Sequence, residues 1–368
     1  MLNRLILYLK NFDWIMFTSV LLLVCFGLAE IYSVALGRSE LDLLNFKKQL
    51  IFVALGLGLL FLFAFIDYHS LRSYSKYFYI AGFIFLAAVL FFGQTIRGTK
   101  GWYSLAGFNL QPVEFIKFVV ILFLAKYFSI ASVKTDEFRH LLISGGFTLA
   151  FVALVLAQPD FGSAMLLFLS WLAMILIVGF NKKYLLAIGL ILALLFGLSW
   201  QFALQDYQKQ RIITFLNPSF NPLSQGYNVS QAIIAVGAGG MTGRGLGFGS
   251  QSQLKFLPEA QTDFIFAVAA EELGFSGVLL ILLFFGILFY RCLYHLKRVN
   301  NDFGVFFILG AMSLIFIEMF INIGMNLGIL PVVGISLPFL SYGGSSLISS
   351  LMLIGVIESI VIRSKINY

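Results

Sequence analysis

Glu114 and Lys117 are two of the few ionisable residues that fall inside the long apolar stretches of this sequence. They stand three residues apart near the start of one stretch, so on a helix they share a face and can neutralise each other. Ionisable groups are costly in an apolar medium, and they mark either a structural ion pair or a polar cavity that positions a charged substrate. The sequence leaves both interpretations open for this pair.

Two aspartates lie where apolar stretches begin. Asp160 sits in Gln158-Pro-Asp-Phe-Gly162, a turn in which Pro and Gly favour a reversal, and its carboxylate is expected to cap the next helix. Asp263 begins a later stretch, where it is either a helix N-cap or a general base. A general base needs only to be ionised and within reach of the hydroxyl that it deprotonates.

The other charged residues of interest form two groups. Four glutamates lie within apolar stretches, where packing inside the bundle is the default interpretation: Glu30, Glu271, Glu272 and Glu318. Five cations lie between stretches, in segments that also hold Trp102, Tyr103 and Tyr207: Arg97, Lys100, Arg211, Arg244 and Lys255. Such cations suit an anionic head group, with aromatic rings that stack on sugars, although a site for generic anionic lipid would have the same composition.

Membrane helices must position these residues. The chain has 368 residues, of which 60% are hydrophobic and 11% charged, whereas soluble domains have about 45–50% and about 25%. A soluble globule is therefore excluded, and the solid Leu, Ile, Phe, Val and Ala runs, which do not alternate with polar residues, exclude an outer-membrane barrel. We predict an all-α integral membrane protein, one domain over 1–368, built as a polytopic bundle of about ten transmembrane helices. The expected spans are 14–36, 49–66, 77–93, 111–130, 141–159, 162–180, 184–204, 264–290, 303–325 and 341–362.

Loop charge predicts the orientation of this bundle. With the N-terminus in the cytoplasm, most of the 24 Lys and Arg residues fall in cytoplasmic loops: Arg4, Lys10, Arg72, Lys76, Lys126, Lys134, Arg139, Lys182, Lys183, Arg291, Lys297, Arg298, Arg363 and Lys365. The short outer loops hold only Arg38, Lys47, Lys48, Arg97 and Lys100. The positive-inside rule then places both termini in the cytoplasm. The net charge of +7 reflects this topology, and no nucleic-acid partner is expected.

A long outer loop, about 205–262, precedes the eighth span. It is rich in glycine between 237 and 249, and one short helix is expected near 227–237. The run Gly243-Arg-Gly-Leu-Gly-Phe-Gly249 has the spacing of a dinucleotide fingerprint, but no strand precedes it, so a Rossmann site is rejected. The two cysteines, Cys25 and Cys292, form neither a disulfide framework nor a metal-site spacing.

Several motifs in register resemble the SEDS family, which comprises RodA, FtsW and SpoVE. They cover essentially the whole chain: Gly101-Trp-Tyr-Ser-Leu-Ala-Gly-Phe-Asn-Leu-Gln-Pro-Val-Glu-Phe-Ile-Lys117, Gln158-Pro-Asp-Phe-Gly162, Leu257-Pro-Glu-Ala-Gln-Thr-Asp-Phe-Ile-Phe266, Ala270-Glu-Glu-Leu-Gly274, Asn322-Ile-Gly-Met-Asn326 and Leu337-Pro-Phe-Leu-Ser-Tyr-Gly-Gly-Ser-Ser346. Three features depart from the family pattern. Gln261 stands where His is frequent, which argues against an essential imidazole, and Glu30 is not expected in the first span. Ser336 stands where many RodA proteins have Pro, a feature closer to the FtsW and SpoVE side. The short C-terminal tail and Lys47-Lys-Gln-Leu favour the RodA branch.

The resemblance implies an enzyme of the bacterial cytoplasmic membrane that polymerises lipid II into peptidoglycan on the outer face, for cell shape or division. It implies that Asp263 is catalytic and that Glu114, Lys117, Asp160 and Arg211 bind substrate, with no nucleotide or redox cofactor. A divalent cation, Mg²⁺ or Mn²⁺, is left open. The implied partners are membrane lipid, a class B penicillin-binding protein and other elongation or division proteins. Two alternatives remain: a flippase for lipid II, and a non-enzymatic scaffold for the penicillin-binding protein.

Overall fold

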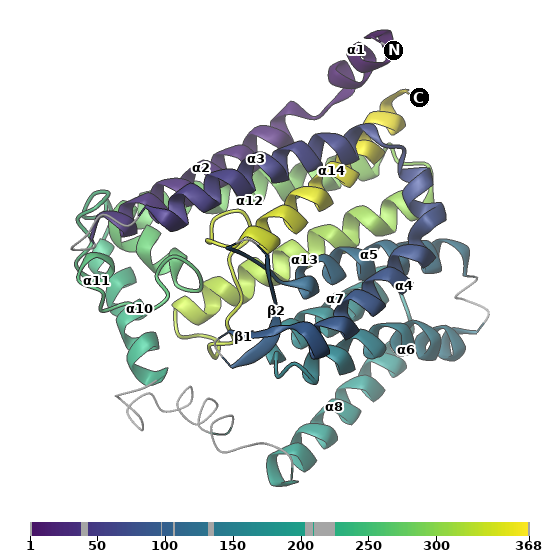
Figure 1. Cartoon of the computed structure of the whole chain (residues 1–368). Helices are drawn as coiled ribbons and strands as arrows, with labels where there is room; N and C mark the ends of the chain where they lie inside the picture. Colours follow the sequence, from purple (N-terminus) through teal and green to yellow (C-terminus); the bar gives the residue numbers. More distant parts are fainter. Residues whose placement is uncertain are drawn as a thin grey trace.

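The computed structural model describes residues 2–37, 43–96, 98–105, 107–131, 136–202, 209 and 225–366. The described chain is a bundle of long helices with one small sheet (Figure 1). Its helices are α1 (Leu2–Asn11), α2 (Trp14–Leu36), α3 (Leu44–Phe65), α4 (Tyr68–Phe92), α5 (Pro112–Ile130), α6 (Glu137–Leu156), α7 (Phe161–Val178), α8 (Lys182–Phe202), α10 (Gln225–Gly239), α11 (Ser250–Gln253), α12 (Ile265–Leu296), α13 (Asp302–Asn326) and α14 (Gly344–Ile366).

The predicted all-α membrane fold is confirmed. Within the described residues, eight helices are long and apolar enough to cross a membrane, namely α2, α3, α4, α6, α7, α12, α13 and α14. The other two expected spans, 111–130 and 184–204, correspond to α5 and α8. Helix α5 carries three charged residues, Glu114, Lys117 and Lys126, within its 19 residues, which sets it apart from the eight. Helices α4 and α12 extend beyond the expected spans because polar residues such as Arg72 and His295 continue them past the apolar run.

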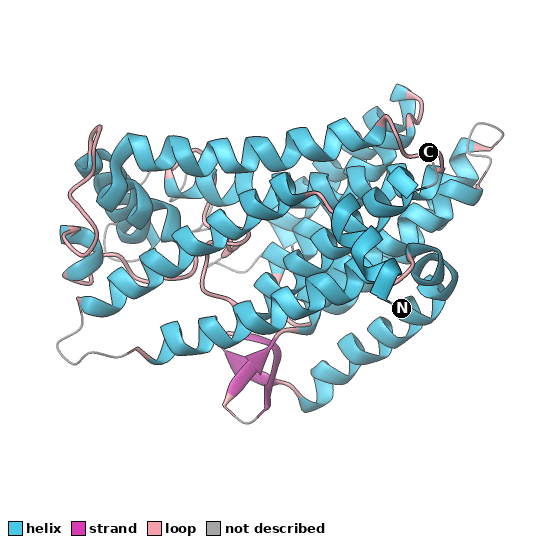
Figure 2. Ribbon diagram, turned by 90° about the horizontal axis from the view of Figure 1, so that it is seen from above, coloured by secondary structure: helices cyan, strands magenta, loops and turns pink. Residues whose placement is uncertain are grey.

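The sequence analysis did not anticipate the small sheet between α4 and α5. Strands β1 (Gln94–Ile96), β2 (Thr99–Leu105) and β3 (Phe108–Leu110) pair antiparallel in the order β1-β2-β3. Gly98 and Gly107 adopt positive φ angles of 83° and 82° between the strands, a conformation that glycine adopts without steric cost. Figure 2 shows this sheet projecting from the side of the helical bundle.

Both termini lie at one end of the bundle (Figures 1 and 2). Asp13, the N-cap of α2, is buried there and accepts bonds from Arg291 Nε at 2.8 Å and His295 Nε2 at 2.5 Å. Burial acts to raise the pKa of Asp13, but the hydrogen bonds from His295 and Arg291 hold it well below its ordinary value. Arg363 of α14 contacts Asp67, between α3 and α4, at 3.3 Å. The terminal end of the bundle is therefore tied together by charged contacts.

Helix α12 is interrupted where the glycine-rich loop enters the bundle. Gly274 has φ 67° and ψ −167°, which breaks the helical hydrogen bonds around it. The loop replaces them: Arg244 N and Gly245 N donate to the carbonyls of Glu271 and Glu272 at 3.0 and 2.9 Å. In the other direction, Phe275 N and Ser276 N donate to the carbonyls of residues 240 and 241 at 2.9 and 3.1 Å. Irregular backbone is tolerated at membrane depth only when such partners are supplied.

We expect Gly274→Ala to destabilise the protein. A Cβ at Gly274 would lie 2.2 Å from Gly243 N, and the positive-φ extended conformation alone costs a non-glycine residue about 1–3 kcal/mol. Gly237→Ala is the matched control, because that glycine lies in α10 with no atom within 4 Å of its Cβ position. Thermal unfolding in detergent should show a lower midpoint for Gly274→Ala only. Equal midpoints for the two variants would contradict the tight contact.

Candidate functional site

A buried ion triad joins α5 to α13. Lys117 Nζ lies 2.7 Å from Glu114 Oε2 on the same helix, which confirms the predicted i, i+3 pair. It also lies 2.5 Å from Glu318 Oε1, a residue for which packing was the default interpretation. The side chain of Lys117 is only 4% exposed. The lysine is therefore held by two carboxylates and is sequestered from solvent.

Asp263 is held at the start of α12 through its backbone. Its carbonyl accepts hydrogen bonds from Asn322 Nδ2 and Asn326 Nδ2, both at 3.0 Å. The helix N-cap is Phe264, which makes no side-chain capping bond, so the N-cap interpretation of Asp263 is wrong. The half-buried Asp263 directly precedes that cap residue.

Helix α13 connects the triad to Asp263. Glu318 and Asn322 are four residues apart, so they share a helix face at about 6 Å along the axis. Asn322 bonds the backbone of Asp263, whereas Glu318 bonds Lys117. The two residues of α13 that bond Asp263 and Lys117 are therefore one helical turn apart.

The segment between α13 and α14 fixes the chain around Asp263 from the other side. Ser341 Oγ donates to the carbonyl of Thr262 at 2.7 Å, and Tyr342 N donates to the carbonyl of Gln261 at 2.7 Å. A Cβ on Gly334 would lie 3.7 Å from Asp263 Oδ2. Both residues that precede Asp263 are therefore bonded to this segment, and Gly334 faces its carboxylate.

Asp160 caps α7, as predicted from its turn. Its Oδ1 accepts from Ser163 N at 3.0 Å, and its Oδ2 accepts from Ser163 Oγ at 2.8 Å and from Gln111 Nε2 at 3.3 Å. Gly162, in the same turn, approaches Val333 so closely that a Cβ would lie 2.6 Å from its carbonyl oxygen. Asp160 is therefore linked through Gln111 to the start of α5, and its turn packs on the segment that covers Asp263.

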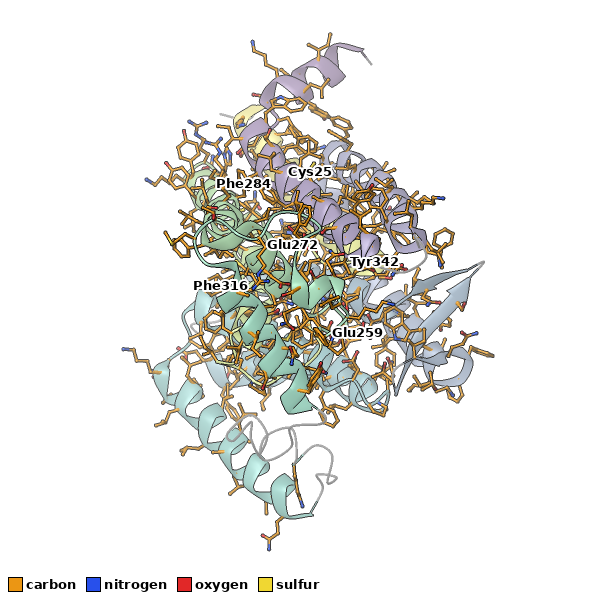
Figure 3. All side chains as sticks on the ribbon, turned by 90° about the vertical axis from the view of Figure 1, so that its left-hand side faces the viewer. Cys25, Glu259, Glu272, Phe284, Phe316 and Tyr342 are labelled. Atoms are coloured by element: carbon orange, nitrogen blue, oxygen red, sulfur yellow. The ribbon has the colours of Figure 1, made fainter. Side chains whose placement is uncertain are left out.

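Glu271 and Glu272, for which packing was the default interpretation, accept hydrogen bonds that anchor the long loop. Glu271 accepts hydrogen bonds from Ser250 Oγ, Gln251 N and Ser252 N, at 2.9 to 3.2 Å. Glu272 accepts from Gly247 N and Gln253 Nε2 at 3.0 and 3.2 Å, and also from Ser33 Oγ and Ser252 Oγ. Figure 3 shows Glu272 inside the molecule, where the green loop segment meets the purple helix α2. The expected short helix near 227–237 is confirmed as α10.

Glu114 and Lys117 form the predicted pair, Asp160 is linked through Gln111 to the start of α5, and Asp263 is bonded through its backbone to α13. Arg211 lies outside the described residues. The sequence analysis missed the part played by Glu318, Asn322 and Asn326. Asn322 and Asn326 were quoted within one motif, and their spacing of four residues was a signal that both amides face the same neighbour.

The divalent cation that the sequence left open stays a prediction. Among the parts of the chain that the structure describes, no group of three or more His, Cys, Asp or Glu side chains is arranged to hold a metal ion. Lys117 lies between Glu114 and Glu318 and bonds both carboxylates. The described residues supply the carboxylate of Asp263, with amide and hydroxyl groups that hold the backbone around it.

Comparison with known proteins places this architecture in a family. Residues 13–366 match the family model FtsW/RodA/SpoVE, described as cell cycle protein. The chain is 37% identical to stage V sporulation protein E of Bacillus subtilis over 95% of this chain and 96% of that protein. It is also 37% identical to the peptidoglycan glycosyltransferase MrdB of Escherichia coli over 89% of each.

The fold of this chain is similar to that of solved structures over nearly its whole length. One such structure concerns the coordination of polymerization and crosslinking by a peptidoglycan synthase complex. A chain of that complex superposes with a TM-score of 0.81 and is 28% identical, and the match covers 96% of this chain and 98% of that chain. The rod shape determining protein RodA of Thermus thermophilus gives 0.70 at 28% identity over 96% and 97%. The protein described here therefore belongs to the FtsW/RodA/SpoVE family.

Proposed function

We propose that this chain is a peptidoglycan glycosyltransferase that polymerises lipid II. The observation that carries the proposal is the convergence of Asp263, Asp160 and the Glu114–Lys117–Glu318 triad on one framework of α5, α7, α12 and α13. The name peptidoglycan glycosyltransferase of the relative MrdB supports it. The 37% identity to both the sporulation protein and MrdB does not separate the branches, so the preference for RodA stays a prediction.

The proposed reaction joins two lipid-linked disaccharides. Asp263 removes the proton from the 4-hydroxyl of the acceptor N-acetylglucosamine, and the resulting oxygen attacks the anomeric carbon of the donor N-acetylmuramic acid. The bond from that carbon to undecaprenyl pyrophosphate breaks, and the pyrophosphate leaves with the electron pair. No nucleotide or redox cofactor is needed for this exchange. The hydrogen bonds from Asn322 and Asn326 support the role of Asp263, because they fix the backbone position from which its carboxylate extends.

Lys117 acts in this proposal by setting the charge of the site. Its ammonium group bonds Glu114 and Glu318 and its side chain is only 4% exposed, so at most one proton remains for a pyrophosphate, and that proton is buried. The direct phosphate contact of the proposal therefore falls to Arg211 and to cations of the long loop such as Arg244, as the sequence suggests. Asp160 caps α7, and we propose that this cap holds the start of α7 in place beside the substrate.

Purified protein supplied with lipid II tests this function. A polymerase makes glycan strands, a flippase moves lipid II across a liposome membrane without lengthening it, and a non-enzymatic scaffold does neither, with or without its partner. We propose a class B penicillin-binding protein as that partner, and the related peptidoglycan synthase complex supports an assembly of this kind. No polymer, with and without the partner, would contradict the enzymatic proposal.

The proposed orientation has the site outside the cytoplasm and both termini inside. Met241→Cys in the loop next to α12 is expected to react with a membrane-impermeant thiol reagent in spheroplasts, because that side chain is 72% exposed. Asn300→Cys, in the exposed turn between α12 and α13, is expected not to react. Both belong in a background that lacks Cys25 and Cys292. The reverse labelling pattern would put Asp263 in the cytoplasm and contradict polymerisation on the outer face.

A further inference from the structure

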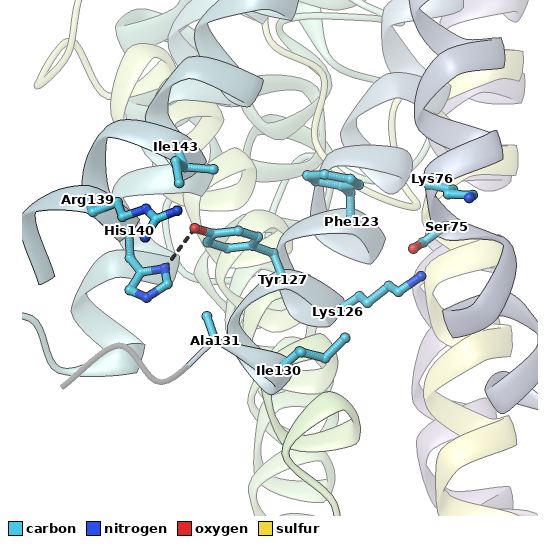
Figure 4. Close-up of a pocket in the computed structure, with 10 residues that line it drawn as sticks. All are labelled: Ser75, Lys76, Phe123, Lys126, Tyr127, Ile130, Ala131, Arg139, His140 and Ile143. Carbon is cyan, nitrogen blue, oxygen red and sulfur yellow. Dashed lines mark hydrogen bonds between the residues drawn. The ribbon is translucent and has the colours of Figure 1, made fainter. Parts of the chain in front are cut away.

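A pocket of about 490 Å³ lies between α4, α5 and α6, far from Asp263 along the chain (Figure 4). Its volume lies within the range of small-molecule sites, which is about 300–1,000 Å³. It is found at the terminal end of the bundle, because α4 begins beside Asp67, which contacts Arg363 near the end of α14. Its walls are formed by Ser75, Lys76, Phe123, Lys126, Tyr127, Ile130, Ala131, Arg139, His140 and Ile143.

Three cations face this pocket from three different helices. Lys76 comes from α4, Lys126 from α5 and Arg139 from α6, and Figure 4 shows Lys76 and Lys126 on one side and Arg139 on the other. Among the described residues, none of the three forms an ion pair with a carboxylate. Lys126 also lies within electrostatic reach of Arg72. The pocket therefore holds positive charge that no described acid balances.

The carboxylates nearest in sequence are engaged elsewhere. Asp136 accepts from the backbone N–H of Arg139 at 3.2 Å as the cap of α6, and Glu137 accepts from Asn181 N at 3.0 Å. Lys126 Nζ donates one of its three protons to the carbonyl of Ser73 at 3.2 Å. Two protons of that ammonium group remain for an anion.

Ser75 adds an unsatisfied hydrogen-bond donor. Its side chain is 0% exposed, and its hydroxyl oxygen has no hydrogen-bond partner among the described residues. Figure 4 shows this hydroxyl directed from α4 toward the space beside Lys126. A buried hydroxyl without a partner is costly, and a ligand oxygen beside Lys126 would satisfy it.

The rest of the pocket is apolar and continues onto the outer surface of the helices. Phe123, Tyr127 and Ile143 line it, and at its edge Ile130 is 64% exposed. Leu142, on the adjacent turn of α6, is 58% exposed. In a membrane-spanning bundle such side chains face acyl chains. Cations at the helix ends beside this apolar surface are the arrangement in which membrane proteins bind anionic head groups.

We propose that this pocket binds the phosphate of an anionic membrane lipid. Lys76, Lys126 and Arg139 supply the charge, the Ser75 hydroxyl donates to a phosphate oxygen, and the acyl chains lie along Ile130 and the outer face of α6. The site is separate from the reaction at Asp263, and its occupancy ties α4, α5 and α6 together at the end of the bundle that holds both termini.

The test uses phosphatidylglycerol as the probe and the purified full-length chain in neutral detergent. Phosphatidylglycerol is expected to raise the thermal midpoint with saturation, whereas phosphatidylcholine and inorganic phosphate at the same phosphate concentration are not. In Lys76→Gln/Lys126→Gln the half-saturating concentration should rise roughly tenfold, since each cation near a membrane surface contributes to binding anionic lipid. Native mass spectrometry should show the same loss of retained lipid.

The matched control is Lys182→Gln/Lys183→Gln, which removes the same charge at the start of α8, at the same end of the bundle. Its half-saturating concentration should equal that of the unmodified protein. An equal loss in both double variants would show a nonspecific surface charge and overturn the site. An equal shift from inorganic phosphate would overturn the lipid assignment. Lys76→Gln alone, at an exposed position, keeps the test decisive if the double variant unfolds.

Ser75→Ala distinguishes a site with a specific phosphate contact from a patch that binds through positive charge alone. The substitution leaves all charges in place and removes the buried donor, so we expect a severalfold weaker response to phosphatidylglycerol with an unchanged or higher midpoint in its absence. An unchanged response would remove Ser75 from the site, and with it the specific phosphate contact that we propose.

Discussion

Asp263→Asn is expected to reduce glycan polymerisation by about 10²–10⁴-fold, the usual contribution of general acid–base catalysis. Asn has nearly the same size and cannot accept the proton from the acceptor hydroxyl. The backbone bonds from Asn322 and Asn326 reach the carbonyl of residue 263, not its side chain, so the fold around the position should be retained. A lipid II polymerisation assay on purified protein measures the change, and Asp263→Ala should behave alike.

Glu259→Gln is the control for this result. It removes one negative charge from the same segment, four residues away, at an exposed position where the side chain accepts from Thr262 Oγ1 at 3.1 Å. We expect polymerisation close to that of the unmodified chain. Full activity in Asp263→Asn, or an equal loss in Glu259→Gln, would show that Asp263 acts only through structure or general charge.

Lys117→Met is expected to destabilise the protein by about 3–5 kcal/mol, because it leaves buried carboxylates without their cation. The effect should be larger than for other single changes in α5, since Glu114 and Glu318 both depend on this lysine. Lys117→Arg keeps the charge and should lose less. Unfolding midpoints in detergent, together with polymerisation rates, measure both consequences.

The triple variant Glu114→Gln/Lys117→Met/Glu318→Gln separates stability from chemistry. It removes all three charges, so the buried site is again neutral and the midpoint should recover toward that of the unmodified protein. If polymerisation stays low in this stable variant, the triad serves the reaction. Full recovery of activity would show that Lys117 and its partners are only structural.

The spans could be predicted because a bilayer leaves few alternatives: long apolar runs must become helices there. The small sheet could not, because 94–110 is short and its strands carry no clear alternation. Helix α4 begins before the expected span because Arg72 and Lys76, which precede the apolar run, are good helix formers.

Local spacing predicted local contacts and nothing more distant. The Glu114–Lys117 pair followed from three residues of separation, and the cap at Asp160 followed from its turn. The third member of the triad, Glu318, is 201 residues from Lys117, and no pattern in one sequence joins them. The N-cap alternative for Asp263 failed because the 258–264 turn continues one residue further, so that Phe264 takes the cap.

The interrupted helix α12 has a consequence for how the chain folds. Four backbone groups around Gly274 are bonded by residues 240–245 of the loop, and each would cost several kcal/mol if left unpaired in lipid. The outer half of α12 therefore cannot settle in the membrane before the loop docks, and the loop has no partner until the helix is in place. The two must form together, as one cooperative unit in which the amide protons of 240–245 and 271–276 lose their protection from exchange at the same free energy.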